Sequence, residues 1–181
     1  MNTITSTPQC RTTLGLLASA ACLALAACAT APTVKWPTAL EPAANESFSM
    51  VLAARGVQIY ECRSKESATT WEFVAPEAEL FNEARKLVGT HGAGPFWQSD
   101  DGSRVVGTMK ARADAPLADA IPWLVLTTRS TGPAGRFSAV TSVRRVNTVG
   151  GNAPQGGCST ATVGAKARVP YTADYFFYTS R

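Results

Sequence analysis

One stretch of the chain collects the residue types that carry out acid–base and nucleophilic chemistry. It reads HGAGPFWQSDDGS, from His91 to Ser103, and contains the single histidine of the sequence. His91 is a candidate base, and Asp100 or Asp101 is a candidate orienting acid; the hydroxyl of Ser99 or Ser103 would then serve as the nucleophile of a hydrolase. The G-x-S-x-G motif is absent, and no strand-to-helix turn is predicted around either serine. The preferred interpretation is therefore a loop and hairpin, with His91 structural or ligand-orienting.

Other acid–base and metal chemistry has weaker support. Glu77 and Glu79 would share one side of a strand, as paired acid–base work requires, but carboxylates beside Pro76 are more simply explained as exposed. Zinc needs three or four His, Cys or carboxylate ligands, and the chain has one histidine. The DDGS stretch lacks the spaced acids of an EF-hand loop and is typical of a β-turn. We expect no metal site and no cofactor.

Aromatic side chains offer a second kind of site. Tyr60, Trp71 and Trp97 fall on or beside predicted strands, and with His91 they are the candidate ligand-binding residues. An aromatic at the rim of a β structure can bind an apolar ring or chain, while nearby polar groups fix its orientation. For Trp97, rim and core remain open alternatives. The glycines between Asn147 and Cys158 favour tight turns over close approach to a ligand.

The cysteines predict one disulfide. Cys10 and Cys22 lie in a predicted export signal, and Cys28 is assigned to lipid. In an oxidising compartment Cys62 and Cys158 are then the remaining partners, so we pair them. The alternative, a redox or nucleophilic cysteine, lacks a C-x-x-C motif and a histidine nearby in sequence.

The N-terminus has the pattern of an export signal. Arg11 precedes an uncharged apolar run over residues 14–25, which is too short to span a bilayer. The following LAAC resembles the lipobox of bacterial lipoproteins, whose cysteine, here Cys28, is acylated. Ala29 follows in place of the aspartate that usually retains such proteins at the inner membrane, so the resemblance implies an outer-membrane lipoprotein held by its lipid anchor. The alternative is ordinary cleavage, which would give a soluble secreted protein.

These features divide the chain into a signal peptide (1–27), a lipid anchor with a Pro/Ala-rich tether (28–46) and one domain (47–181). Loss of Arg11, with no acid lost, lowers the formal charge from +4 to +3. A mild positive charge without Lys/Arg runs argues against nucleic acid as a partner. Arg144 and Arg145 are adjacent, but neighbours on a strand face opposite sides. Nothing in the sequence specifies an oligomeric state.

The elements that must position these residues are predicted to be strands. Short β-branched and aromatic runs alternate with Gly, Pro, Asp and Asn. SFSMVLAARGVQIYECRS predicts two strands about a turn at Arg55 and Gly56, and GPFWQS with SRVVGTMKARA predicts a hairpin. AELFNEARKLVG fits a helical turn or a strand, and KARVPYTADYFFYTSR a strand pair or one broken strand. We expect an all-β, single-domain antiparallel barrel or sandwich of about eight strands, with at most short helical turns.

Several blocks then carry a resemblance to a known family: GVQIYECR, WEFVAPEAELF, VGTHGAGPFWQSDDGSRVVG, IPWLVL, VTSVRRVNTVGGNAPQGGC and YTADYFFY. Their order resembles the domain-of-unknown-function family numbered 3455, which occurs in exported bacterial and fungal proteins, and the resemblance covers nearly all of Met50 to Tyr178. It implies no established activity. Some members carry a dehydrogenase name, but G-x-G-x-x-G is lacking here. The family block usually reads HYAGPTW, whereas this chain has Gly92 for the tyrosine and Phe96 for the threonine.

The function predicted from these observations is that of an envelope lipoprotein whose β domain binds a small ligand or an envelope component. Two alternatives remain open: a periplasmic or extracellular hydrolase that uses His91 with Asp100 or Asp101, and a structural or protein-interaction module. A cavity that brings the histidine, a carboxylate and a hydroxyl together would favour the hydrolase. An apolar pocket with few polar groups would favour the binding module.

Overall fold

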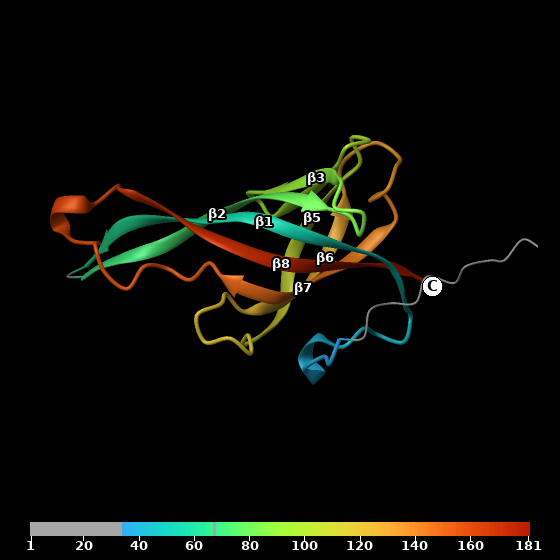
Figure 1. Ribbon diagram of the computed structural model, residues 1–181, viewed down its shortest axis with the longest axis horizontal. Coiled ribbons are helices and arrows are strands. Elements are labelled where there is room, and N and C mark those ends of the chain that lie inside the picture. The colour runs from blue at the N-terminus through green and yellow to red at the C-terminus, as the bar shows by residue number, and fades with distance from the viewer. Residues whose placement is uncertain (1–33, 67) are drawn as a thin grey trace, which may run out of the picture. The chain divides into compact units, whose positions relative to one another are not determined.

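A computed structural model describes residues 34–66 and 68–181, and these residues form one closed sheet of eight strands. The strands are β1 (Glu46–Lys65), β2 (Ala68–Phe81), β3 (Leu87–Gly92), β4 (Phe96–Ser99), β5 (Arg104–Ala113), β6 (Trp123–Ser130), β7 (Val140–Gly150) and β8 (Lys166–Ser180), and the short 3-10 helices are η1 (Thr38–Leu40) and η2 (Thr160–Thr162). Each strand pairs antiparallel with its neighbours, and β1 also pairs with β8 (Figure 1). The predicted all-β architecture of about eight strands is confirmed, and the sheet closes as a barrel.

The first predicted turn does not exist. β1 is one continuous strand of 20 residues that runs through Arg55 and Gly56. A side chain at Gly56 would bring its Cβ to 2.1 Å from the Glu77 carbonyl oxygen, so the glycine permits close approach of β2 and does not mark a turn. The segment left undecided between helix and strand contains the end of β2, a turn and the start of β3. At the C-terminus, β8 is likewise one strand, with Pro170 inside it.

The inward-facing residues fill much of the barrel with a single apolar cluster. This cluster includes Leu52 and Ala54 on β1, Leu80 on β2, Trp97 on β4 and Phe177 on β8. Inward and outward residues alternate along each strand, as the pleat requires. On β5 the cross-strand partner of Trp97 is Val105, and the next inward position is Gly107, where a Cβ would lie 2.9 Å from the Trp97 ring. The missing side chain therefore makes room for a buried indole.

A second apolar cluster lies on the outer face of β6, β7 and β8 and involves the segment that precedes β1. Leu40 in η1 is fully buried, and the Trp36 ring packs edge-on against Phe176 at 5.4 Å. The Arg144 guanidinium holds this segment through its Nε, which donates to the Leu40 carbonyl oxygen at 2.8 Å, and through an ion pair with Glu46 at 2.6 Å. The sequence analysis assigned residues 34–45 to a tether. In the structure this segment packs against the outer face of the barrel through Val34, Trp36 and Leu40.

At one end the barrel is extended by three strands alone. Before Tyr171 the strand β8 pairs with β1 alone among the described strands, and before Ala78 the strand β2 does the same. We call these residues, 57–65, 68–77 and 166–170, the extension; it projects from the body of the barrel in Figure 1. Because β2 leaves β3 at this point, one edge of β2 pairs with none of the described strands. Pro76 lies in that part of β2, where a missing backbone donor costs nothing.

Candidate functional site

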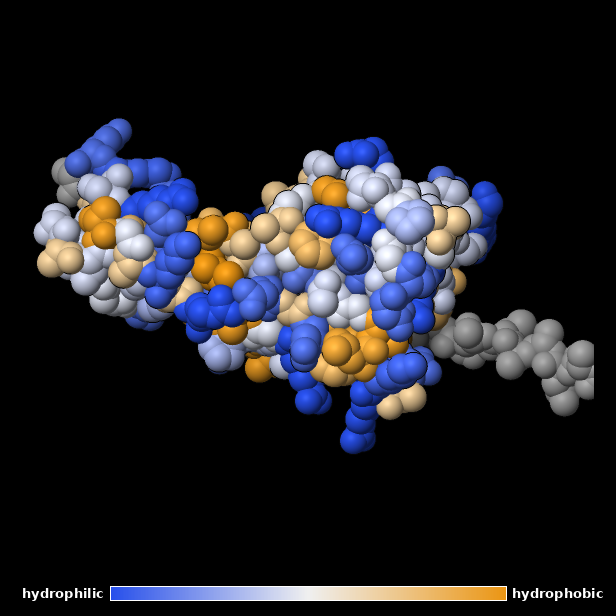
Figure 2. Space-filling view, turned by 90° about the horizontal axis from the view of Figure 1, so that it is seen from above, coloured by the Kyte–Doolittle hydropathy of each residue, from blue (hydrophilic) through white to orange (hydrophobic). Residues whose placement is uncertain are grey.

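A cavity of about 330 Å³ lies where the unpartnered edge of β2 leaves the barrel. Its size is at the lower end of the range of small-molecule sites. Of the residues described by the structure, those that line it come from seven strands and the β3–β4 turn: Phe73, Val74, Pro76, His91, Gly94, Pro95, Trp97, Met109, Leu124, Leu126, Arg145 and Tyr175. Figure 2 shows apolar surface gathered between the extension and the body of the barrel.

Two β-bulges shape the mouth of this cavity. On β2 the register passes from Ala75 to Phe73, which leaves Val74 as an extra residue. On β5 it passes from Met109 to Ala111. A bulge bends its strand and re-aims the neighbouring side chains. Phe73 and Met109 are 52% and 59% exposed, so two large apolar side chains that line the cavity also face solvent.

The wall of the cavity is an aromatic stack around His91. The imidazole lies nearly parallel to the Trp97 ring, with centroids 4.6 Å apart and planes at 16°, and the Tyr175 ring is 5.0 Å away. The Nδ1 of His91 is 2.7 Å from the Phe96 carbonyl oxygen. A carbonyl only accepts, so Nδ1 carries the proton and donates it. Trp97 is buried in the core and also lines the cavity. Both of the positions left open by the sequence, core and rim of a site, therefore apply in part.

The polar groups of the wall are neutral apart from one. Burial lowers the pKa of His91 to about 3; the hydrogen bond to Phe96 opposes this shift, and the charge of Arg145 adds to it. Burial also raises the pKa of Tyr175. At neutral pH the imidazole and the phenol are therefore uncharged.

Arg145 supplies the one formal charge among the described residues that line the cavity. It stands directly opposite Tyr175 in the β7–β8 register and is 9% exposed. Its Nη2 and Nε donate to the Pro122 carbonyl oxygen at 2.8 and 3.2 Å. Its neighbour Arg144 points to the outer face, so the two arginines lie on opposite sides of β7, as strand alternation predicts.

The two predicted catalytic aspartates lie at the β4–β5 turn, where they hold a neighbouring loop. Asp101 accepts the Ser103 hydroxyl at 2.6 Å and the Arg136 amide at 2.7 Å. These hydrogen bonds, that of the serine hydroxyl first, lower the pKa of Asp101. Asp100 accepts the Ser99 hydroxyl at 3.0 Å and pairs with the Arg136 guanidinium at 3.4 Å.

No hydrogen bond or ion pair joins His91 to either aspartate within the described residues. The histidine uses Nδ1 for the backbone carbonyl of Phe96, whereas a catalytic histidine would use it for the orienting acid. The structure therefore does not bring the proposed base, acid and nucleophile together. His91 lies near the turn between β3 and β4, whereas Asp100 and Asp101 follow the other end of β4.

Of the remaining candidate ligand-binding residues, neither Tyr60 nor Trp71 lines the cavity. Tyr60 lies behind one of the residues that do. The Tyr60 hydroxyl donates to the Gly151 carbonyl oxygen at 2.7 Å, and its ring packs edge-on against Phe73, which lines the cavity. Burial raises the pKa of Tyr60. Glu77 lies on the surface, paired with Arg168 at 2.8 Å.

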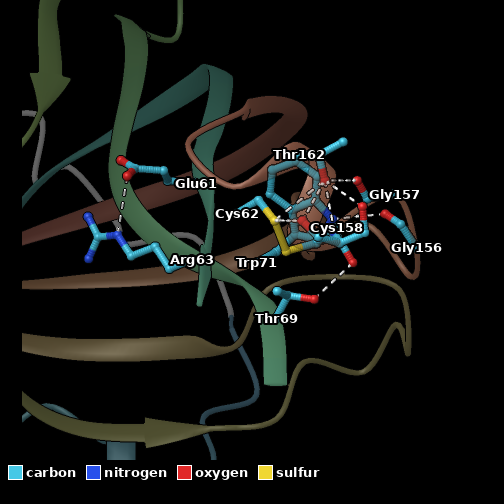
Figure 3. The surroundings of a disulfide bond; sticks show 10 residues. Glu61, Cys62, Arg63, Thr69, Trp71, Gly156, Gly157, Cys158 and Thr162 are labelled. Carbon is cyan, nitrogen blue, oxygen red and sulfur yellow. Dashed lines mark hydrogen bonds and ion pairs between the residues drawn. A yellow bond between two sulfur atoms is a disulfide. The ribbon is translucent and has the colours of Figure 1, made fainter. Parts of the chain in front are cut away.

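Trp71 instead braces the disulfide at the end of the extension (Figure 3). Cys62 and Cys158 are bonded, with Cα atoms 5.3 Å apart, which confirms the predicted pairing. The Trp71 Nε1 donates to the Gly156 carbonyl oxygen at 2.9 Å, and the Thr69 hydroxyl donates to the Cys158 carbonyl oxygen at 3.3 Å. The glycine-rich loop before Cys158 is thus fastened to β2 by a covalent bond and by hydrogen bonds.

The cavity contains residues that the sequence analysis did not select, and three of them matter most. Phe73 lies two residues after Trp71 on the same side of β2, so strand alternation was an available signal. Tyr175 lies in the aromatic block YTADYFFY, which the sequence analysis did not assign to a site. Arg145 follows Val143 at strand spacing, and a basic residue in phase with an inward apolar face is a signal in itself.

Within the part of the chain that the structure describes, no group of three His, Cys, Asp or Glu side chains could hold a metal ion. No helix of that part is long and apolar enough to cross a membrane. The signal peptide and Cys28 lie outside the described residues.

Comparison with known proteins gives one finding. The model of a family described as "Protein of unknown function (DUF3455)" matches residues 42–179. No curated protein and no solved structure matches the chain.

Proposed function

The chain belongs to the DUF3455 family of proteins of unknown function, and from this premise we propose that its β-barrel is a binding module that takes a small, largely apolar ligand into the cavity beside His91. The proposal rests on the site itself, because membership of this family names no activity. The cavity combines an enclosed aromatic wall with an apolar mouth, which is the usual composition of a small-molecule site.

The observation that carries the proposal is the pair of exposed apolar side chains at the mouth. Phe73 and Met109 leave more than half of their surface in water although each lies beside a β-bulge that directs it to the cavity. Covering exposed apolar surface at a concave site with a ligand is favourable, because that surface is removed from water. Trp97 and Leu126 continue this surface inward. A planar or chain-like apolar ligand would contact Trp97 and Leu126 inside the cavity and cover Phe73 and Met109 at its mouth.

We place this binding module in the cell envelope. The LAAC sequence supports acylation of Cys28, and Ala29 supports an outer-membrane destination. Mass spectrometry of the mature protein is expected to show an acylated cysteine as the first residue, and Cys28→Ser is expected to abolish the modification. A mature chain that begins after Cys28 and carries no lipid would contradict the proposal and favour a secreted protein.

Ligand binding is tested with N-phenyl-1-naphthylamine, a neutral apolar probe whose fluorescence rises when it leaves water. The purified protein is expected to bind it in the cavity. Met109→Glu places a carboxylate at the mouth and is expected to weaken binding about tenfold or more, because the probe must then desolvate a charge. Val163→Glu is the matched control, since Val163 is 51% exposed but lies beside η2.

The outcomes separate the alternatives. Weaker binding by Met109→Glu alone, with both variants unfolding at the temperature of the wild type, supports the cavity. An equal loss in both variants would locate the probe elsewhere on the surface and overturn the proposal. Failure of the wild-type protein to bind the probe would also overturn it and favour a structural or protein-interaction role.

A further inference from the structure

Two adjacent arginines of β7 are buried in very different ways. Arg144, 2% exposed, has a full set of partners: the Glu46 carboxylate at 2.6 Å, the Ser142 hydroxyl, two backbone carbonyls and the Tyr178 ring. Arg145, 9% exposed, donates to the Pro122 carbonyl oxygen, and its other described polar neighbour is the neutral Tyr175 hydroxyl. Of the described residues, no carboxylate forms an ion pair with Arg145. The charge on the outer face is compensated, and the charge in the barrel is not.

A buried cation without a counter-ion is costly, and one carbonyl dipole with one neutral phenol compensates it only in part. The neighbours of Arg145 cannot supply the missing negative charge. Burial holds the pKa values of Tyr60, Tyr171 and Tyr175 above their ordinary range, so these phenols stay protonated. His91 is neutral for the same reason. The barrel interior around the cavity therefore carries a net positive charge that faces an otherwise apolar lining.

We propose that the cavity binds a carboxylate ligand whose head group pairs with Arg145 and whose apolar body packs against Trp97 and Leu126. This inference rests on the proposed function, since it names the ligand class of the same cavity. A guanidinium matches a carboxylate in shape and charge. A phosphate monoester would bring a second negative charge into a cavity that offers a single cation, which favours the monoanion.

The volume of the cavity limits the size of the ligand. About 330 Å³ corresponds to roughly eleven waters at about 30 Å³ each. A carboxylate with about ten non-hydrogen atoms therefore fits, whereas a long-chain fatty acid would have to leave part of its chain in solvent beyond Phe73 and Met109. A medium-length acyl chain or a single ring with a short acidic arm has the required size.

The test is a matched series of octanoate, 1-octanol and octylammonium, each used to displace N-phenyl-1-naphthylamine from the purified protein. The three share one chain and differ in the head group. Octanoate is expected to displace the probe at a concentration about tenfold or more below that of 1-octanol, because its head group gains a charge-assisted hydrogen bond. Octylammonium is expected to be the weakest because it faces Arg145 with like charge.

Variants then assign the preference to one residue. Arg145→Met is expected to abolish the advantage of octanoate while it keeps the binding of 1-octanol. Arg145→Lys is expected to retain part of the advantage, since lysine keeps the charge but not the planar fork. Arg129→Met removes an equal charge from an exposed position of β6 and is expected to change nothing.

Failure of this inference is distinct from failure of the proposed function. If the probe and 1-octanol bind but octanoate has no advantage in the wild-type protein, the carboxylate inference is overturned and the binding module stands. An advantage that survives in Arg145→Met also overturns it. If neither the probe nor any member of the series binds, the proposed function itself is wrong. The wild-type series needs no variant, so the test remains decisive even if Arg145→Met does not fold.

Discussion

The buried imidazole of His91 is expected to make the stability of the barrel depend on pH between 5 and 7. The folded protein has a His91 pKa of about 3, well below the ordinary value of 6.5. Between these two values the unfolded chain binds a proton that the folded barrel excludes. The contribution of His91 to stability is therefore fully present above pH 6.5 and is lost progressively as the pH falls toward 3.

The size of the effect follows from the shift. Each pH unit below the unfolded pKa costs about 1.4 kcal/mol of unfolding free energy, so lowering the pH from 7 to 5 is expected to cost about 2 kcal/mol. The carboxyl groups with a lowered pKa, which are Glu46, Glu72, Glu77 and Asp101, titrate below this window. The interval from pH 5 to 7 therefore isolates the histidine.

The assay is urea unfolding, followed by tryptophan fluorescence at constant ionic strength at pH 5, 6 and 7. His91→Phe is the control variant, since phenylalanine keeps an aromatic ring against Trp97 and removes the titrating group. Its absolute stability will differ because the Phe96 carbonyl loses a donor, but its pH dependence in this interval should be nearly flat. Equal slopes in the two proteins, or no slope in the wild type, would refute the reasoning. The imidazole would then be hydrated in the fold, and a role as base would regain support.

Three further predictions test the packing and the covalent bracing. Cys62→Ala with Cys158→Ala is expected to lower the unfolding free energy by up to about 4.7 kcal/mol, since the bond closes a loop with a sequence separation of 96; a change below about 1 kcal/mol in urea unfolding would contradict this. Burial raises the pKa of Glu46, but hydrogen bonds, that from its arginine partner first, outweigh it and leave the pKa lowered. Glu46→Gln is therefore expected to cost about 3 kcal/mol at pH 7 and to flatten the loss of wild-type stability below about pH 4.5, as measured by urea unfolding across that range. Gly92→Tyr alone should destabilise the barrel by about 1–3 kcal/mol, because a Cβ at position 92 would lie 2.6 Å from the Phe96 ring, and Phe96→Thr should relieve it in the double variant; additive losses in a double-mutant cycle would show that the two positions are independent.

The coupling expected between positions 92 and 96 follows from the β3–β4 pairing. Gly92 and Phe96 are direct cross-strand partners on β3 and β4, and the phenylalanine ring covers the glycine while the Arg104 guanidinium stacks on it at 3.8 Å. The Phe96 ring occupies the space that a side chain at position 92 would need, so the residue types at the two positions depend on each other.

Local sequence patterns predicted most of the strands and the disulfide. The features that they did not predict depend on contacts between segments that are distant in the sequence. Alternation and turn residues indicated the strands, and the two cysteines left after the signal indicated the disulfide. Gly56 was taken for a turn because a glycine that permits close approach of another strand looks the same in sequence. Leu40 was placed in a tether because a single side chain has no periodicity, although it is fully buried in the fold.

The candidate site was predicted only in part for a related reason. His91 and Trp97 were selected from one short stretch, and the structure places both on the cavity wall. Phe73 and Arg145 reach the same cavity from β2 and β7, and a β-bulge beside the first directs it there. Strand alternation could have marked the side of the strand on which each residue lies, but a bulge is a property of the pairing between strands, so the position of the cavity mouth could not be predicted from one strand. The hydrolase hypothesis grouped residues that are neighbours in sequence but belong to opposite ends of a hairpin.

The pairing of β1 with β8 also has a consequence for the rate of folding. Glu46 pairs with Ser180, so the barrel cannot close until nearly the whole chain is present. Pairings between such distant positions carry a large loop-closure entropy, and proteins that depend on them fold in milliseconds to seconds. The disulfide joins the far end of β1 to the loop that leads into β8. A chain that forms this bond early has a shorter search for its last strand pairing, so the oxidised protein should close its barrel faster than the reduced one.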